Sequence, residues 1–234
     1  MFHADPGFRP SAIETSASLA VDGVELEFPI GRSGVREFDL DLGRWDDALV
    51  EVWAVEWDVD PKTLVMLFRG RVGGFRRSAA LAASVVFEVR SEVGQTLRSR
   101  VPACSPLCRA ELGDDRCGVD LSDRQSEAEA RATTDGVVRL GAPPPDPERW
   151  ALGWLRFLDG PLAGVDRRIL TVAGAAVHVE GWLPSRDEVS WRVGLTEGCD
   201  KRLETCRSRF ANALSFRGEP FVPGTDALLR FGHE

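Results

Sequence analysis

The sequence predicts a mainly β protein. It would consist of an N-terminal antiparallel β sandwich or barrel-like domain, a second small β unit, and a loop and short-helix module that holds a metal cluster on four cysteines. Three observations predict this class. Short runs of β-branched and aromatic residues recur between turn signals along most of the chain. Helical periodicity is confined to one stretch near the end. The five cysteines gather in two segments that flank the second β unit.

The first hundred residues predict strands joined by turns. Leu49–Trp57 alternates cleanly, which would place Trp53 and Trp57 on one face and in the core. Gly70 divides an apolar stretch and is expected to be the turn of a hairpin. The expected elements are strands over residues 19–30, 49–57, 63–68, 71–75 and 82–89, and a short capped segment over 40–48.

The remainder of the chain changes character twice. A short helix is expected over 91–97, and residues 126–131 are a charged run. Leu203, Cys206 and Phe210 recur at spacings of three and four, which predicts a helix over 198–213. The second β unit would use residues 137–140, 152–158, 168–172, 176–179 and 189–193. The predicted domains are 1–98, an inserted β domain over 126–195, and a cysteine module formed by 99–125 and 196–234.

The charge balance argues against nucleic acid as the main partner. The net charge is -8 and the pI is near 5.1, so the surface as a whole repels phosphate. Four arginines interrupt this acidic balance, and we expect them on the solvent face of two strands: Arg69, Arg71, Arg76 and Arg77. No targeting signal and no membrane-length apolar stretch is present, which favours folding in a cytoplasm, where thiols stay reduced.

Four of the cysteines form two pairs. Eight residues separate Cys108 from Cys117, and six separate Cys199 from Cys206. Neither pair is a C-x-x-C, so a zinc finger or ribbon is not the direct interpretation. In a reducing compartment, metal ligation and inert burial are the two open readings. Thiolates bind both zinc and iron–sulfur clusters, and the spacing does not separate the two; Cys104 is expected to be a bystander.

Two passages carry a resemblance to a known family. They are Cys108–Asp120 and Gly198–Asn212, the second followed by Phe216–Gly224. Together they resemble the tail-tip baseplate hub proteins of gene transfer agents and of related siphophage and prophage tails. The paired spacings are also similar to those of the minor tail protein L of lambda-type phages. The resemblance covers most of the chain; members of that family usually carry a further N-terminal segment, so this chain is expected to begin inside the first domain.

The resemblance implies a role, a location and a cofactor. It implies a virion component of the tail tip, made in the bacterial cytoplasm, that forms a homo-oligomeric ring, a trimer, between the distal tail protein and the central tip or fibre protein. A tail-associated cell-wall peptidase would lie nearby. It further implies an iron–sulfur cluster, of the four-iron, four-sulfide (4Fe–4S) type, held as a structural staple by Cys108, Cys117, Cys199 and Cys206. Zinc in the same site and a redox or electron-transfer protein are the alternatives.

The other chemistry-bearing residues do not predict an enzyme. Of the three histidines, His178 lies in a strand pattern, and no Ser-His-Asp grouping is legible. Asp114 and Asp115 are expected to be solvated turn residues beside the cysteines rather than a general acid and base. A wall-degrading enzyme or a sugar-binding tryptophan surface is therefore disfavoured.

Overall fold

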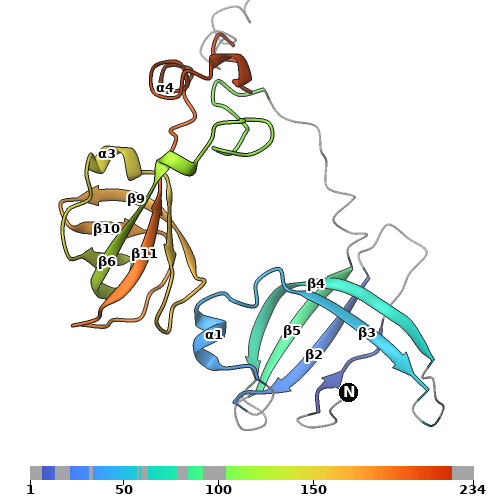
Figure 1. Ribbon diagram of the computed structural model, residues 1–234. Helices are drawn as coiled ribbons and strands as arrows, with labels where there is room; N and C mark the ends of the chain where they lie inside the picture. Colours follow the sequence, from blue (N-terminus) through green and yellow to red (C-terminus); the bar gives the residue numbers. More distant parts are fainter. Residues whose placement is uncertain are drawn as a thin grey trace, which may run out of the picture. The chain divides into compact units, whose positions relative to one another are not determined.

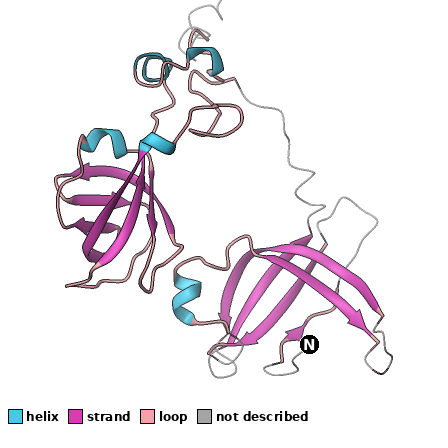
Figure 2. Cartoon of the chain, viewed as in Figure 1, coloured by secondary structure: helices cyan, strands magenta, loops and turns pink. Residues whose placement is uncertain are grey.

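The computed structural model of the protein describes residues 7–13, 22–31, 34–56, 58, 63–78, 84–91 and 104–222. The chain divides into two compact units, residues 1–101 and 102–234. Strands dominate both units, and the helices of the described residues are short (Figure 2). The second unit contains the predicted inserted β domain together with both cysteine segments.

The first unit is one open antiparallel sheet that curls into a half-barrel (Figure 1). Its five strands follow the order β1-β2-β5-β4-β3, so β1 and β3 are its edges. One short helix, α1 (Glu37–Asp41), follows β2. The strands are β1 (Arg9–Pro10), β2 (Gly23–Pro29), β3 (Leu49–Val55), β4 (Leu64–Ser78) and β5 (Ser84–Ser91). The mainly β prediction is confirmed, and in the described residues the single curled sheet agrees with the barrel-like alternative and not with a sandwich.

Alternation along the strands builds the core of the first unit. In β2, Val24 and Leu26 are buried while Glu25 between them is exposed. Leu40 of α1 joins the same apolar cluster, which explains why the helix packs on the sheet. The buried members of the cluster are Val24, Leu26, Val35, Leu40, Phe68, Val72, Val85, Phe87 and Val89.

Gly70 is not the turn of a hairpin. β4 runs through it as one strand of 15 residues, and residues 63–68 and 71–75 belong to the same strand. A Cβ at Gly70 would overlap the carbonyl oxygen of Arg90 on the neighbouring strand β5. Glycine is needed here because two backbones approach closely, and not because the chain turns.

Trp53 was expected in the core, but its side chain is exposed to solvent. Its exposed fraction is 42%, whereas Val50 and Val52 point to the core. A β-bulge after Val52 shifts the register between β3 and β4. Trp57 lies outside the described residues. In the described residues, the part of β4 before Gly70 pairs only with β3, and this two-stranded ribbon carries a run of half-exposed apolar side chains: Leu64, Val65, Met66 and Leu67.

The second unit contains a closed antiparallel barrel (Figure 1). Its strands follow the order β10-β7-β6-β11-β8-β9. Side chains with no exposed area fill its interior, among them Leu155, Phe157, Ile169, Val177 and Val193. The helix α3 (Pro147–Trp150) lies between β7 and β8 in the chain. The strands are β6 (Gln125–Thr134), β7 (Val137–Leu140), β8 (Trp154–Phe157), β9 (Asp166–Ala173), β10 (Ala176–Val179) and β11 (Trp191–Thr196).

β6 corrects the interpretation of residues 126–131 as a charged run outside the strands. Glu127, Glu129 and Arg131 alternate with alanines, and Ala130 is fully buried. Alanine is a poor strand former, so the residue types concealed a real period of two. The strand is fixed by its ladders with β7 and β11.

The cysteine segments form loops and short helices. The predicted helix over 198–213 shortens to α4 (Leu203–Ser208), followed by the 3-10 turn η2 (Ala213–Ser215). Lys201 and Ala211 adopt positive φ angles of 64° and 50°, which end the helical path on either side. The helix expected over 91–97 lies outside the described residues. Among the described helices, none is long and apolar enough to cross a membrane.

Candidate functional site

The four paired cysteines line one small apolar cavity of about 20 Å³. Cys108 and Cys117 come from the loop before η1 (Ser122–Arg124), Cys199 follows β11, and Cys206 lies on α4. We call these four residues the cysteine site. Cys104 is exposed and does not line the cavity. The remaining lining residues are Ala110, Leu112, Val119, Lys201, Arg202, Phe210, Asn212 and Ser215.

Asp114 shapes the loop that carries the first pair. Its Oδ1 accepts hydrogen bonds from the backbone N–H groups of Arg116 and Cys117, at 3.0 and 2.7 Å, and its Oδ2 accepts one from Glu111 N–H at 3.0 Å. Burial raises the pKa of this carboxyl, but these hydrogen bonds outweigh burial and the net shift is downward. Asp114 is therefore more than a solvated turn residue, because it fixes the backbone of Cys117.

A close approach of two backbones places Cys199. A Cβ at Gly198 would overlap the carbonyl oxygen of Ala151, and a Cβ at Gly153 would overlap that of Thr196. Neither position has room for a side chain, so the segment that leads into Cys199 lies directly against the end of the barrel. After Cys199, Asp200 Oδ1 accepts from Arg202 N–H at 3.0 Å, which sets the turn into α4.

Hydrogen bonds join the two cysteine segments. Cys108 N–H donates to Lys201 C=O at 2.8 Å, and Lys201 Nζ donates to Ala110 C=O at 2.6 Å. Glu219 and Arg109 form a bidentate pair, with nitrogen–oxygen distances of 2.5 and 2.7 Å. Segments about a hundred residues apart in sequence are thus tied at several points around the same cavity.

Three of the four sulfurs accept N–H hydrogen bonds. The backbone N–H of Lys201 points at Cys199 Sγ and that of Arg217 at Cys108 Sγ, both at 3.3 Å. The side-chain amide of Asn212 lies 3.7 Å from Cys117 Sγ. Such donors stabilise negative charge on sulfur, and thiolate is the form that binds metals.

The thiols that are most buried resist ionisation without a cation. Burial raises the pKa of Cys199, and the N–H and charge of Lys201 offset part of that shift. Burial also raises the pKa of Cys206, and the other three thiols of the site raise it further through like-charge repulsion. A bound cation relieves both effects, and its binding would release protons.

Glu197 anchors the cysteine site to the barrel. Its side chain has no exposed area and pairs with three arginines, at 2.9 Å to Arg124, 3.4 Å to Arg149 and 2.6 Å to Arg209. Burial raises the pKa of the Glu197 carboxyl, but the hydrogen bonds from these arginines outweigh burial and lower it overall. Because Arg124 and Arg149 precede barrel strands and Arg209 follows α4, the pairs connect the module to the barrel end.

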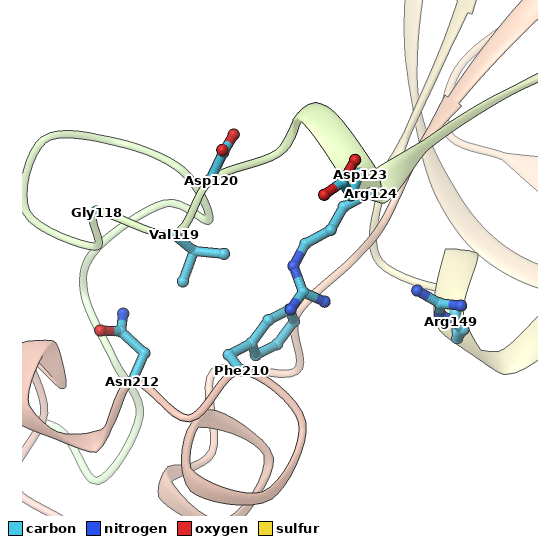
Figure 3. A pocket seen from close by; sticks show the side chains of 8 residues that line it. All are labelled: Gly118, Val119, Asp120, Asp123, Arg124, Arg149, Phe210 and Asn212. Atoms are coloured by element: carbon cyan, nitrogen blue, oxygen red, sulfur yellow. The ribbon is translucent and has the colours of Figure 1, made fainter.

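A solvent-open pocket of about 460 Å³ lies next to the cysteine site. Figure 3 shows the Arg124 guanidinium over the ring of Phe210, with Val119 and Asn212 at the other end of the pocket. Val119, Phe210 and Asn212 line both this pocket and the cysteine cavity. These three side chains therefore form the wall between the cavity and solvent.

The four thiols of the cysteine site are a donor set for two kinds of metal group, a zinc ion and an iron–sulfur cluster. A zinc ion needs its thiolates within about 2.3 Å of one point. In the part of the chain that the structure describes, no group of three or more His, Cys, Asp or Glu side chains is arranged to hold a metal ion in that way. Four thiols around a shared cavity, with N–H donors on three sulfurs, are a donor set whose chemistry suits zinc and an iron–sulfur cluster alike.

The structure brings together all four predicted site residues and leaves Cys104 apart. Sequence reasoning missed Gly198 and Asn212, and it took Asp114 for a solvated turn residue; all three position the cysteines. Gly198 directly before Cys199 was the one available signal, because glycine beside a candidate ligand often marks close backbone contact. His178 is an exposed strand residue, as predicted.

Comparisons with known proteins agree on one family. Residues 1–120 match the model of the baseplate hub protein, N-terminal attachment domain, and residues 148–226 match that of the phage conserved hypothetical protein BR0599. A chain in the solved virion of a native gene transfer agent (GTA) particle is 31% identical, with a TM-score of 0.82. The match covers 96% of this chain and 80% of that one. None of the curated proteins matches.

Proposed function

This chain belongs to the baseplate hub protein family of phage-like tails, and from that membership we propose that it is a non-catalytic subunit joining the distal tail ring to the central tip protein. The supporting observation is the likeness to a GTA virion chain along 96% of this sequence. The chain is thus a virion component of the baseplate, at the tail tip.

Labelling of intact particles tests this placement. Gold-conjugated antibodies raised against the chain should bind one end of the tail in electron micrographs. Particles that lack the gene should show no label and should fail to complete their tips. Label on the capsid, or particles that assemble and deliver DNA normally without the chain, would contradict the proposal. Peptidoglycan hydrolysis by the purified chain would contradict its non-catalytic part.

The proposed partners include further copies of the chain. We propose a homo-oligomeric ring, a trimer, with a tail-associated cell-wall peptidase nearby. Support comes from the first unit, whose sheet is open in the described residues and has β3 at one edge. The ribbon before Gly70 adds half-exposed apolar side chains, and a large exposed apolar patch is typical of a protein interface.

The proposed cofactor is an iron–sulfur cluster of the 4Fe–4S type, bound by the cysteine site. Cys108, Cys117, Cys199 and Cys206 would each supply one thiolate. When bound, the cluster supplies strong metal–sulfur bonds that hold the two cysteine segments together. The shared cavity and the N–H donors support a metal group bound by thiolates. The resemblance of the two cysteine passages to tail-tip hub proteins, and not the geometry, is what favours the cluster over zinc.

Metal and acid-labile sulfide analysis of protein purified without oxygen tests the cofactor. We expect iron and sulfide in the wild type, a brown thiolate-to-iron absorption, and loss of both metal and solubility in Cys117→Ser and Cys199→Ser. Cys104→Ser is the matched control and should keep its iron. A finding of zinc without sulfide would mean that the site holds zinc and not an iron–sulfur cluster. Equal loss of metal in all three variants would refute the ligand assignment.

A further inference from the structure

We propose that Asn212 is a positioning residue that couples the two halves of the cysteine site and tunes the thiolate of Cys117. This inference rests on the proposed metal group. The residue is not a ligand in the proposal and would act through its neighbours. Its place in the fold is the residue directly before η2, after α4.

Asn212 contacts one cysteine from each half of the site. Its Nδ2 donates to the carbonyl oxygen of Cys117 at 2.7 Å and lies 3.7 Å from Cys117 Sγ. Its backbone N–H donates to Cys206 C=O at 2.9 Å, and in the metal-free chain its C=O accepts from the Cys206 thiol at 3.2 Å. One residue thereby connects the loop of the first pair to the helix of the second.

The orientation of the amide is fixed by its partner. A carbonyl oxygen only accepts hydrogen bonds, so the group facing Cys117 O must be the NH₂ end of the side chain. The preceding residue, Ala211, has a φ of 50°, a conformation that costs energy for a residue other than glycine. This turn directs Asn212 back toward the cavity, and its cost is offset by the four contacts.

Asn212 differs from the other donors in being removable. The N–H groups that reach Cys199 and Cys108 belong to the backbone and persist in any variant other than proline. At Cys117 the donor is a side chain. Its loss leaves more electron density on that sulfur, and hydrogen bonds to sulfur are one of the factors that set a cluster's reduction potential. Removing the donor should therefore make the potential more negative.

Asn212 also stands in the wall between the cysteine cavity and the open pocket (Figure 3). Truncation to alanine removes part of this wall. Small solutes in the pocket then reach the cavity more easily, and the release of metal to a chelator should accelerate. Loss of the wall and loss of the hydrogen bond both accelerate metal release, whereas only loss of the hydrogen bond shifts the reduction potential.

The experiment compares anaerobically purified wild type with Asn212→Ala, Asn212→Asp and Leu214→Ala. Leu214 is the matched control, because it lies two residues on in η2 and is fully exposed. We expect Asn212→Ala to release iron to a chelator about 10- to 100-fold faster, the size typical for loss of an outer-shell hydrogen bond. Its potential should be more negative than in the wild type, and Asn212→Asp, which adds a charge and cannot donate, should shift it further.

Asn212 is the only asparagine in the sequence, which permits a direct check of its hydrogen bond. Protein labelled with ¹⁵N-asparagine has a single side-chain amide pair, and its protons should exchange slowly with water. Wild-type potential and release rate in Asn212→Ala would overturn the inference while leaving the cluster intact. A wild type that holds neither metal nor sulfide would overturn the proposed cofactor and the tuning role together.

Discussion

Glu219 shows how one residue holds the cysteine segments together. Its carboxylate accepts from Arg109 at two points and from Ser105 N–H at 2.9 Å. The Arg109 hydrogen bonds, followed by that from Ser105, lower the pKa of Glu219 to about 2. In an unfolded chain this pKa is about 4.3. Because the folded pKa is the lower one, the stabilisation is complete above pH ~4.3 and is lost as pH falls toward 2.

Glu219→Gln should therefore lower the thermal midpoint of the metal-free chain at pH 6, and its effect should shrink as pH falls from about 5 to 3. The measurement is the difference in midpoint between wild type and variant across this range. Glu127→Gln is the control, because Glu127 is exposed and its nearest arginine nitrogen, on Arg192, is 3.8 Å away. A difference that stays constant with pH would show that the carboxylate charge of Glu219 does not stabilise the fold.

At the scale of single elements, β4 depends on the absence of a side chain at Gly70. An alanine there would meet the Arg90 carbonyl and the Phe68 ring, so β4 and β5 would have to separate. We expect Gly70→Ala to cost roughly 1–3 kcal/mol of unfolding free energy, the usual range for overpacking. Gly74 lies in the same strand and has no neighbouring atom within 4 Å, so Gly74→Ala should be neutral or stabilising.

Hydrogen exchange of β4 and β5 peptides measures this difference within the first unit. Protection should fall in Gly70→Ala and be retained in Gly74→Ala. Peptides from the barrel should be unchanged in both variants, because the barrel belongs to the other compact unit. Equal protection in the two variants would mean that β5 moves aside without cost.

The elements that the sequence predicted well are those with a local signal. β10 was predicted with its observed bounds, because Ala176–Val179 is a β-branched run between turns. β6 was missed because its alternating alanines and charges carry no strand propensity, and only its neighbours in the barrel fix it. Gly70 was wrongly predicted as a hairpin turn for a similar reason. The backbone that approaches it closely belongs to Arg90, which is twenty residues away in sequence.

The sequence was enough to predict the four cysteines of the site, but not the residues that surround and position them. Thiol chemistry and spacing identified its four members, and the structure places them around one cavity. Asn212 and Asp114 act through hydrogen bonds whose partners depend on the folded loops. Their residue types are common in turns, so nothing in the sequence distinguished them from ordinary turn residues.

At the scale of the whole molecule, the two units differ in how completely the backbone hydrogen-bonding groups of their strands are paired within the unit. The barrel is closed and so has no free sheet edge, and the hydrogen bonds around the cysteine site join residues of the second unit to each other. The first unit keeps an open sheet and the half-exposed apolar ribbon. We therefore expect residues 102–234, produced alone, to fold as a monomer.

That fragment should keep the metal content and the thermal midpoint that the second unit shows in the full chain. Residues 1–101 alone should self-associate in sedimentation velocity runs as concentration rises. Replacing Val65 and Leu67 with lysine in that fragment should suppress the association, because charge on an exposed strand opposes edge pairing. A fragment 102–234 that loses its metal would show that the second unit depends on the first, and a fragment 1–101 that stays monomeric at all concentrations would contradict association through the ribbon.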